Sequence, residues 1–158
     1  MTAAAAAVPD VHAPAQAHSH AHTHAVDLLA RTIWGEARGE SVRGQEAVAA
    51  VVMNRLARSR AKGGYWWGDS VAEICLKPRQ FSCWNSTDAN WPKLLLVVPP
   101  DPGFECCLRI ARRAVAGSLG DCTGQATHYH ANHVSPRWAA GHAPSAWVGR
   151  HLFYNDIL

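Results

Sequence analysis

The chain has 158 residues, 48% of them hydrophobic, which is enough for one folded domain with a sizeable core. Its formal net charge is +3 and its basic residues are spread along the sequence, so an acidic polymer suits it better than nucleic acid. No stretch approaches the roughly 18 apolar residues of a membrane span, which argues against a transmembrane helix.

Residues 1–25 differ in composition from the rest of the chain. They are mostly Ala, Pro and His, with almost no large apolar side chain, so a disordered tail is expected there. The alanine run ends at Pro9 without a basic segment before it, and no secretory signal peptide is predicted. Loose metal binding is an alternative role for the four alternating histidines of the tail, His18, His20, His22 and His24. The folded domain is predicted to cover residues 26–158.

Two helices are predicted at the start of this domain. Residues 26–37 carry a stripe of apolar side chains, and Gly35 and Gly39 are expected to loosen the end of that helix. The second helix is predicted from about Ser41, a suitable N-cap, to Arg58. Its centre is apolar almost all round, which indicates a helix inside the domain.

The rest of the domain alternates between short elements and turns. A capping box of Ser70 and Glu73 predicts a short helix or a turn over residues 70–75, and a turn-rich segment follows from Lys77. A third long helix is predicted over residues 104–117.

Two strands are predicted near the C-terminus, within residues 126–134 and 148–155, which alternate between apolar and polar side chains. The expected fold class is therefore α+β, mostly helical with a small antiparallel sheet. Five cysteines lie between residues 75 and 122. A bridge such as Cys83 with Cys107 is possible if the protein works outside the cytoplasm, but the sequence does not choose a pairing.

Glu36 is the leading candidate for acid–base chemistry. It ends an apolar helix between Gly35 and Ala37, where partial burial favours the protonated form of a carboxyl group. A glycosidase needs such an acid to protonate the leaving oxygen. Taken alone, however, an ordinary glutamate at a helix end is the simpler interpretation.

Several blocks of the sequence resemble the SleB/CwlJ family of cell wall hydrolases, which includes spore cortex-lytic enzymes. They are residues 30–40 with the run GEARGE, residues 44–55, the run QFS at residues 80–82, and the blocks at 124–138 and 149–154. The resemblance covers residues 26–155. It implies a compact lysozyme-like domain that cleaves peptidoglycan glycan strands without a cofactor, and it maps the family's catalytic glutamate onto Glu36.

In the better-understood members of this family the reaction is a lytic transglycosylation between N-acetylmuramic acid and N-acetylglucosamine. The C6 hydroxyl of the muramic sugar attacks its own anomeric carbon, so water is not consumed. A hydrolase normally uses a second carboxylate. No partner stands out among the candidates Glu40, Glu46, Asp69 and Asp88, so a transglycosylase is favoured over a muramidase.

Five residues in the resembling blocks are predicted to contact the substrate: Gln80, Phe81, Tyr129, Asn132 and Trp138. Phe81 and Trp138 are equally suited to a place in the core. Trp66 and Trp67 lie in a glycine-rich loop outside the matched blocks, and exposed tryptophan there would indicate a glycan-binding lip.

A zinc site is the main competing interpretation. His128 and His130 would share one face of a strand, and with His133 or His142 they could bind zinc as in a peptidoglycan amidase. The absence of an HExxH motif argues against this, as does the absence of nearby acids. His151 is expected to be a buried, hydrogen-bonded core histidine.

Outside catalysis, an inactive cell-wall-binding module is an alternative that the intact GEARGE run disfavours. The expected partner is the glycan strand of peptidoglycan, the expected state a monomer, and the expected place of action the periplasm or cell wall. Without a signal peptide, an endolysin that stays cytoplasmic until released also fits.

Overall fold

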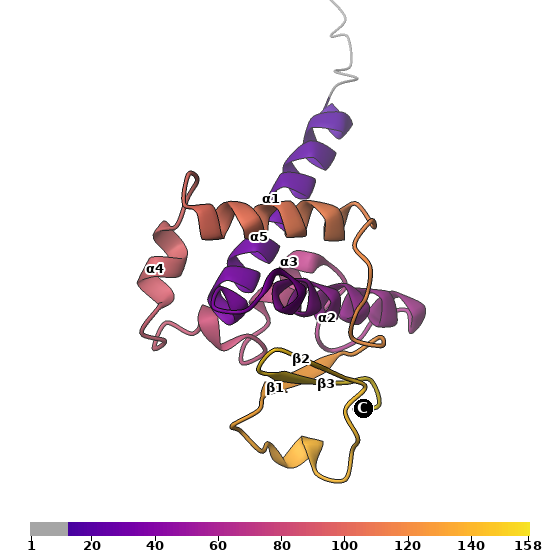
Figure 1. Ribbon diagram of the computed structural model, residues 1–158. Helices are drawn as coiled ribbons and strands as arrows, with labels where there is room; N and C mark the ends of the chain where they lie inside the picture. Colours follow the sequence, from indigo (N-terminus) through magenta and orange to yellow (C-terminus); the bar gives the residue numbers. More distant parts are fainter. Residues whose placement is uncertain (1–12) are drawn as a thin grey trace, which may run out of the picture.

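The computed structural model describes residues 13–158 of the chain (Figure 1). Its helices are α1 (Ala13–Ala37), α2 (Val42–Ala61), α3 (Val71–Leu76), α4 (Trp91–Leu96) and α5 (Pro102–Val115), with short 3-10 segments η1 (Ser82–Trp84) and η2 (Arg137–Ala139). The four predicted helices are confirmed. Helix α4 lies in the segment predicted as turns, because six residues opened by Asn90 and Pro92 are too few to show helical periodicity.

Helix α1 starts at Ala13, well before the predicted beginning of the folded domain at Val26. The predicted disorder is therefore wrong for residues 13–25. Alanine has the highest helix propensity, and Pro14 stands in the first turn, where its missing N–H costs nothing. Residues 16–24 are exposed and this part of α1 projects from the body, so the segment adds nothing to the core, as expected (Figure 1). The first part of the predicted tail, residues 1–12, lies outside the described residues.

The core is built around α2, whose predicted burial is confirmed. Val48, Val51 and Val52 on this helix are fully buried. Helix α1 packs against both α2 and α5, and it closes the core with Leu29 and Ile33. Ser41 caps α2 by accepting a hydrogen bond from the Gly44 N–H. These contacts fix the C-terminal end of α1, which carries Glu36, against the rest of the domain.

The sheet lies beside α2 at the other side of the domain from α5 (Figure 1). Its strands are β1 (His128–Ala131), β2 (Ala146–Val148) and β3 (His151–Tyr154), all antiparallel in the order β1–β3–β2. The predicted pair of strands is confirmed. The second predicted strand is in fact split, because Gly149 at a φ of 58° turns the chain between β2 and β3. Tyr129 of β1 lies opposite Phe153 of β3.

All five cysteines are free thiols, so the bridge considered between Cys83 and Cys107 is not formed. Both of these side chains are buried. Within residues 13–158, no helix combines the length and the apolar character needed to cross a bilayer.

Candidate active site

A cleft of about 380 Å³ lies between the end of α1, the segment around η1, and β1. Glu36 enters it from α1, Tyr129 from β1 and Gln80 from the segment before η1. The full lining comprises Glu36, Arg55, Arg79, Gln80, Ser82, Asn85, Tyr129, His130, Ala131, Val134, Pro136, Trp138 and His151. The cleft therefore brings together residues from sequence blocks that lie far apart in the chain.

Both carboxylate oxygens of Glu36 are held by hydrogen bonds. Its Oε1 accepts from the backbone N–H of Cys83 at 3.1 Å and from the Ser82 hydroxyl at 3.5 Å. Its Oε2 accepts from the Tyr129 hydroxyl at 2.8 Å. The side chain is half-buried, and its orientation is fixed from two directions. Such a carboxyl group is positioned before any ligand arrives, as efficient acid–base catalysis requires.

Gly35 allows the Cys83 segment to approach Glu36 closely. A Cβ atom added at Gly35 would lie 2.5 Å from the Cys83 Cβ and 2.8 Å from its Sγ, which is closer than packed atoms tolerate. Gly35 lies inside regular helix, so the expectation that it loosens the end of α1 is wrong. Its function is to bring the donating N–H of Cys83 within reach of Glu36.

Tyr129 is fixed as a hydrogen-bond donor to Glu36. Its ring stacks on Phe153 at 5.6 Å between centroids and meets the edge of His151 at 5.1 Å. Burial raises the pKa of the Tyr129 hydroxyl well above its usual range, and the adjacent Glu36 charge adds to this effect. The hydroxyl therefore keeps its proton and continues to donate at any pH near neutrality.

Arg55 supports the floor of the cleft from the buried side of α2. Its Nε donates to the Thr127 carbonyl at 2.7 Å and its Nη1 donates to the Gln80 side-chain oxygen at 3.2 Å. Its guanidinium also lies over the rings of Phe81 and Trp67. Burial lowers the pKa of Arg55 to about 10, which still leaves it charged at neutral pH. Arg55 thus ties Gln80 to the start of β1.

The predicted substrate-contacting residues are only partly brought together. Gln80, Tyr129 and Trp138 line the cleft. Phe81 requires a correction, because its side chain is 2% exposed and packs in the core beneath Arg55, so it supports the cleft and does not line it. Asn132 is exposed just after β1 and is not part of the lining; its backbone N–H donates to the Arg150 carbonyl.

Glu36 is the only carboxylate among the described residues that line the cleft. Glu40, the nearest candidate partner in sequence, accepts a hydrogen bond from Arg150 Nε at 2.8 Å, and its side chain is 7% exposed. Burial alone would raise the pKa of Glu40, but the Arg150 hydrogen bonds hold it below its usual value. The other three candidates are engaged elsewhere: Glu46 with Arg113, Asp69 with the Ser59 hydroxyl, and Asp88 with the backbone of Asn90.

The histidines considered as zinc ligands form part of an aromatic wall instead. His128 and His130 do share a face of β1, and both rings pack against Trp138, at 5.4 and 5.6 Å. Both nitrogens of His130 are engaged, with the Ala131 carbonyl and the Tyr154 hydroxyl, and His133 is exposed. Burial, aided by nearby arginines, lowers the pKa of His128 to about 4. Over residues 13–158, no three His, Cys, Asp or Glu side chains are grouped as metal ligands, including the tail histidines from His18 on.

The cleft also contains residues that the sequence did not mark as site candidates, among them Arg55, Ser82 and His151. Arg55 carried a usable signal, since a charged residue within a helix that is apolar almost all round must have buried partners. Ser82 gave no signal beyond its place in the QFS run. His151 is buried as predicted, but its Nδ1 has no hydrogen-bond partner among the described residues, contrary to the expectation, and burial lowers its pKa.

Comparisons with known proteins show similarity over most of the chain. The sequence profile of the family described as Cell Wall Hydrolase matches residues 39–154. The spore cortex-lytic enzyme of Halalkalibacterium halodurans is 31% identical over 82% of this chain, and that of Bacillus subtilis is 28% identical over 81%. The matched parts are 34% and 36% of those proteins, so the chain spans about a third of the length of these relatives.

Two solved structures share the fold. The catalytic domain of the Bacillus cereus SleB protein superposes with a TM-score of 0.61 at 25% identity, covering 84% of this chain and 90% of that domain. The catalytic domain of SleB from Bacillus anthracis, named as a germination-specific lytic transglycosylase, superposes with a TM-score of 0.60 at 24% identity, covering 82% and 93% of the two chains. The predicted α+β fold class is confirmed.

Proposed function

Because this chain belongs to the Cell Wall Hydrolase family, we propose that it cleaves peptidoglycan between N-acetylmuramic acid and N-acetylglucosamine as a lytic transglycosylase. The observation that carries the proposal is the single carboxylate of the cleft, Glu36, with both of its oxygens positioned by donors. The similarity of the chain to spore cortex-lytic enzymes and to a lytic transglycosylase domain supports this chemistry.

In the proposed reaction Glu36 acts first as an acid. Its carboxyl proton passes to the glycosidic oxygen, and the bond from the muramic anomeric carbon to that oxygen breaks. The C6 hydroxyl oxygen of the same muramic sugar then bonds to the anomeric carbon. Glu36, now a carboxylate, takes the hydroxyl proton and is ready for another cycle. The products are a 1,6-anhydromuramic end and a free N-acetylglucosamine hydroxyl, and no water is consumed.

The surrounding residues have distinct parts in this scheme. Tyr129 and the Cys83 N–H hold the carboxyl group in place while it gains and loses its proton. Gln80, steadied by Arg55, offers an amide for the hydroxyl and acetamido groups of the glycan. Trp138 presents an aromatic face to a sugar ring. A second carboxylate that would activate water is not found among the described lining residues, and this favours the intramolecular hydroxyl as nucleophile.

The proposed substrate also sets the place and state of action. Peptidoglycan lies outside the cytoplasmic membrane, so the enzyme would act in the periplasm or cell wall. Its one complete cleft gives no need for a second subunit, and we propose that it acts as a monomer without a cofactor.

Mass spectrometry of purified peptidoglycan after digestion tests this function. Anhydro-muropeptides are the expected product, with and without a chelator. Reducing muramic ends would instead assign a muramidase, and freed stem peptides lost on chelation would assign a zinc amidase. An undigested polymer would leave the domain as a binding module.

A further inference from the structure

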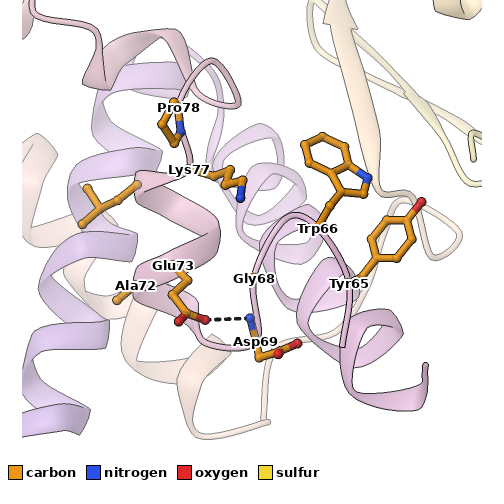
Figure 2. Close-up of a pocket in the computed structure, with 9 residues that line it drawn as sticks. Tyr65, Trp66, Gly68, Asp69, Ala72, Glu73, Lys77 and Pro78 are labelled. Atoms are coloured by element: carbon orange, nitrogen blue, oxygen red, sulfur yellow. Dashed lines mark hydrogen bonds between the residues drawn. The ribbon is translucent and has the colours of Figure 1, made fainter. Parts of the chain in front are cut away.

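A second pocket, of about 510 Å³, lies outside the cleft, between α3 and the glycine-rich loop that precedes it (Figure 2). Its volume is in the range of small-molecule sites. It shares no lining residue with the cleft that holds Glu36. The lining consists of Tyr65, Trp66, Gly68, Asp69, Ala72, Glu73, Leu76, Lys77 and Pro78.

The two tryptophans of this loop have opposite roles. Trp67 is 1% exposed, and its indole N–H donates to the Arg55 carbonyl at 3.1 Å, which anchors the loop on α2. Trp66 is 52% exposed, and its ring packs against Trp67 and Tyr65 at centroid distances of 5.8 and 6.2 Å. A large apolar ring is therefore held open to solvent on an anchored loop, where a ligand can reach it.

Gly68 fixes the other side of the loop against α3. Its φ is 115°, and an added Cβ would lie 2.6 Å from the Cβ of Glu73. Glu73 in turn accepts hydrogen bonds from the N–H groups of Asp69 and Ser70 through its Oε2. The glycine-rich loop and α3, which form the two walls of the pocket, are thus joined by close packing and hydrogen bonds.

Polar groups line the pocket together with the exposed Trp66 ring. Asp69 Oδ2 and Glu73 Oε1 accept no hydrogen bond from the described residues, and Lys77 forms no ion pair with them. Figure 2 shows Lys77 extending from the end of α3 toward the side of the pocket that Trp66 occupies. A pocket that combines an exposed aromatic ring with free carboxylate oxygens and one ammonium group matches a sugar, whose C–H face is apolar and whose edge carries hydroxyl and acetamido groups.

The pocket and the cleft are lined by consecutive residues of one segment. Pro78 lines the pocket and the next residue, Arg79, lines the cleft. The backbone of Arg79 is held at a φ of 65°, a conformation unusual for a residue other than glycine, so the chain turns sharply there. Aromatic rings also connect the two sites, since Trp67 lies 6.0 Å from His128 and His128 lies 5.4 Å from Trp138 of the cleft.

We propose that this pocket is a distal binding site for an N-acetylated sugar residue of the same glycan strand that the cleft cleaves, with Trp66 as its stacking platform. This inference rests on the proposed function. The distal site would hold long strands while Glu36 acts on a bond further along, so it would contribute to binding of polymer and leave the chemical step unchanged.

The test measures binding of peptide-free glycan strands to the full chain carrying Glu36→Gln, which separates binding from turnover. Adding Trp66→Ala should weaken binding by about two- to tenfold, the range expected for loss of one aromatic stacking contact. Trp66→Tyr should restore most of it. The matched control is Trp147→Ala, because Trp147 is 65% exposed on β2 and lines neither site. Thermal unfolding confirms that each variant is folded.

In the otherwise wild-type enzyme, Trp66→Ala should raise KM for polymer and leave kcat unchanged. Unchanged binding in the Trp66→Ala variant would overturn the distal site, and so would a loss of binding seen only with strands that carry stem peptides. Neither result touches the proposed function, which fails if the wild-type enzyme releases no anhydro-muropeptides from peptidoglycan.

Discussion

Tyr129→Phe removes one oxygen atom from the site and thereby tests how Glu36 is positioned. The hydroxyl donates to Glu36 Oε2 at 2.8 Å, and Tyr129 is otherwise held by ring contacts that phenylalanine keeps. A hydrogen bond to a charged group contributes roughly 1.5–3 kcal/mol. If that energy serves to hold the carboxyl group in the transition state, kcat should fall about ten- to 150-fold. The assay is the rate of glycan release from purified peptidoglycan at saturating substrate.

The pH dependence of turnover gives a second test of the Tyr129→Phe variant. Since burial and the Glu36 charge raise the pKa of the Tyr129 hydroxyl, the wild-type enzyme keeps this donor throughout the range below the ordinary tyrosine pKa of about 10. Ionisation of Tyr129 should therefore add no step to the pH–rate profile of the wild-type enzyme that Tyr129→Phe lacks in that range. Tyr154→Phe is the matched control, because it deletes a hydroxyl bonded to His130 and leaves the Glu36 hydrogen bonds intact. Wild-type turnover in Tyr129→Phe, or an equal loss in the control, would refute the positioning role.

Two further predictions concern the packing around the acid. Gly35→Ala should lower the free energy of unfolding, measured by denaturant titration, by about 1–3 kcal/mol and should reduce turnover, because the new methyl group displaces Cys83. Gly120→Ala is the control: a methyl group at Gly120 meets open space, so neither stability nor turnover should change. Glu40→Gln should keep wild-type turnover but lower stability by about 1 kcal/mol near neutral pH, through loss of the Arg150 pair. Because the pKa of Glu40 is lowered by folding, this stability difference should disappear as pH falls through that lowered pKa. A folded Glu40→Gln enzyme without activity would mean that a second carboxylate is needed.

Signals that act over a few residues predicted the local structure well. Ser70 and Glu73 form the expected capping box, and Ser41 caps α2 as expected. Such motifs are readable because both partners lie within one turn of helix. The helix over residues 13–25 was not predicted, because the low hydrophobicity of this segment indicated disorder. An alanine-rich segment without internal breakers nevertheless favours helix.

Contacts between distant segments explain what the sequence did not reveal. Gly35 appeared to be a helix breaker, because its close neighbour Cys83 belongs to another segment. Phe81 sits beside Gln80 in the chain, yet only Gln80 reaches the cleft, and nothing in an irregular segment indicates which of two neighbours points inward. The prediction that Tyr129 contacts the substrate depended on the family resemblance, and the structure places the Tyr129 hydroxyl 2.8 Å from Glu36.

The central claim, that Glu36 alone drives an intramolecular transfer, is tested most directly by digesting peptidoglycan in isotope-labelled water with the wild-type enzyme and with Glu36→Gln. The muropeptides are reduced at once and analysed by mass spectrometry. The account predicts anhydro-muropeptides free of the heavy oxygen from the wild-type enzyme and no new glycan ends from the folded variant. Heavy oxygen at new muramic ends, or a Glu36→Gln digest that matches the wild-type digest, would contradict the account.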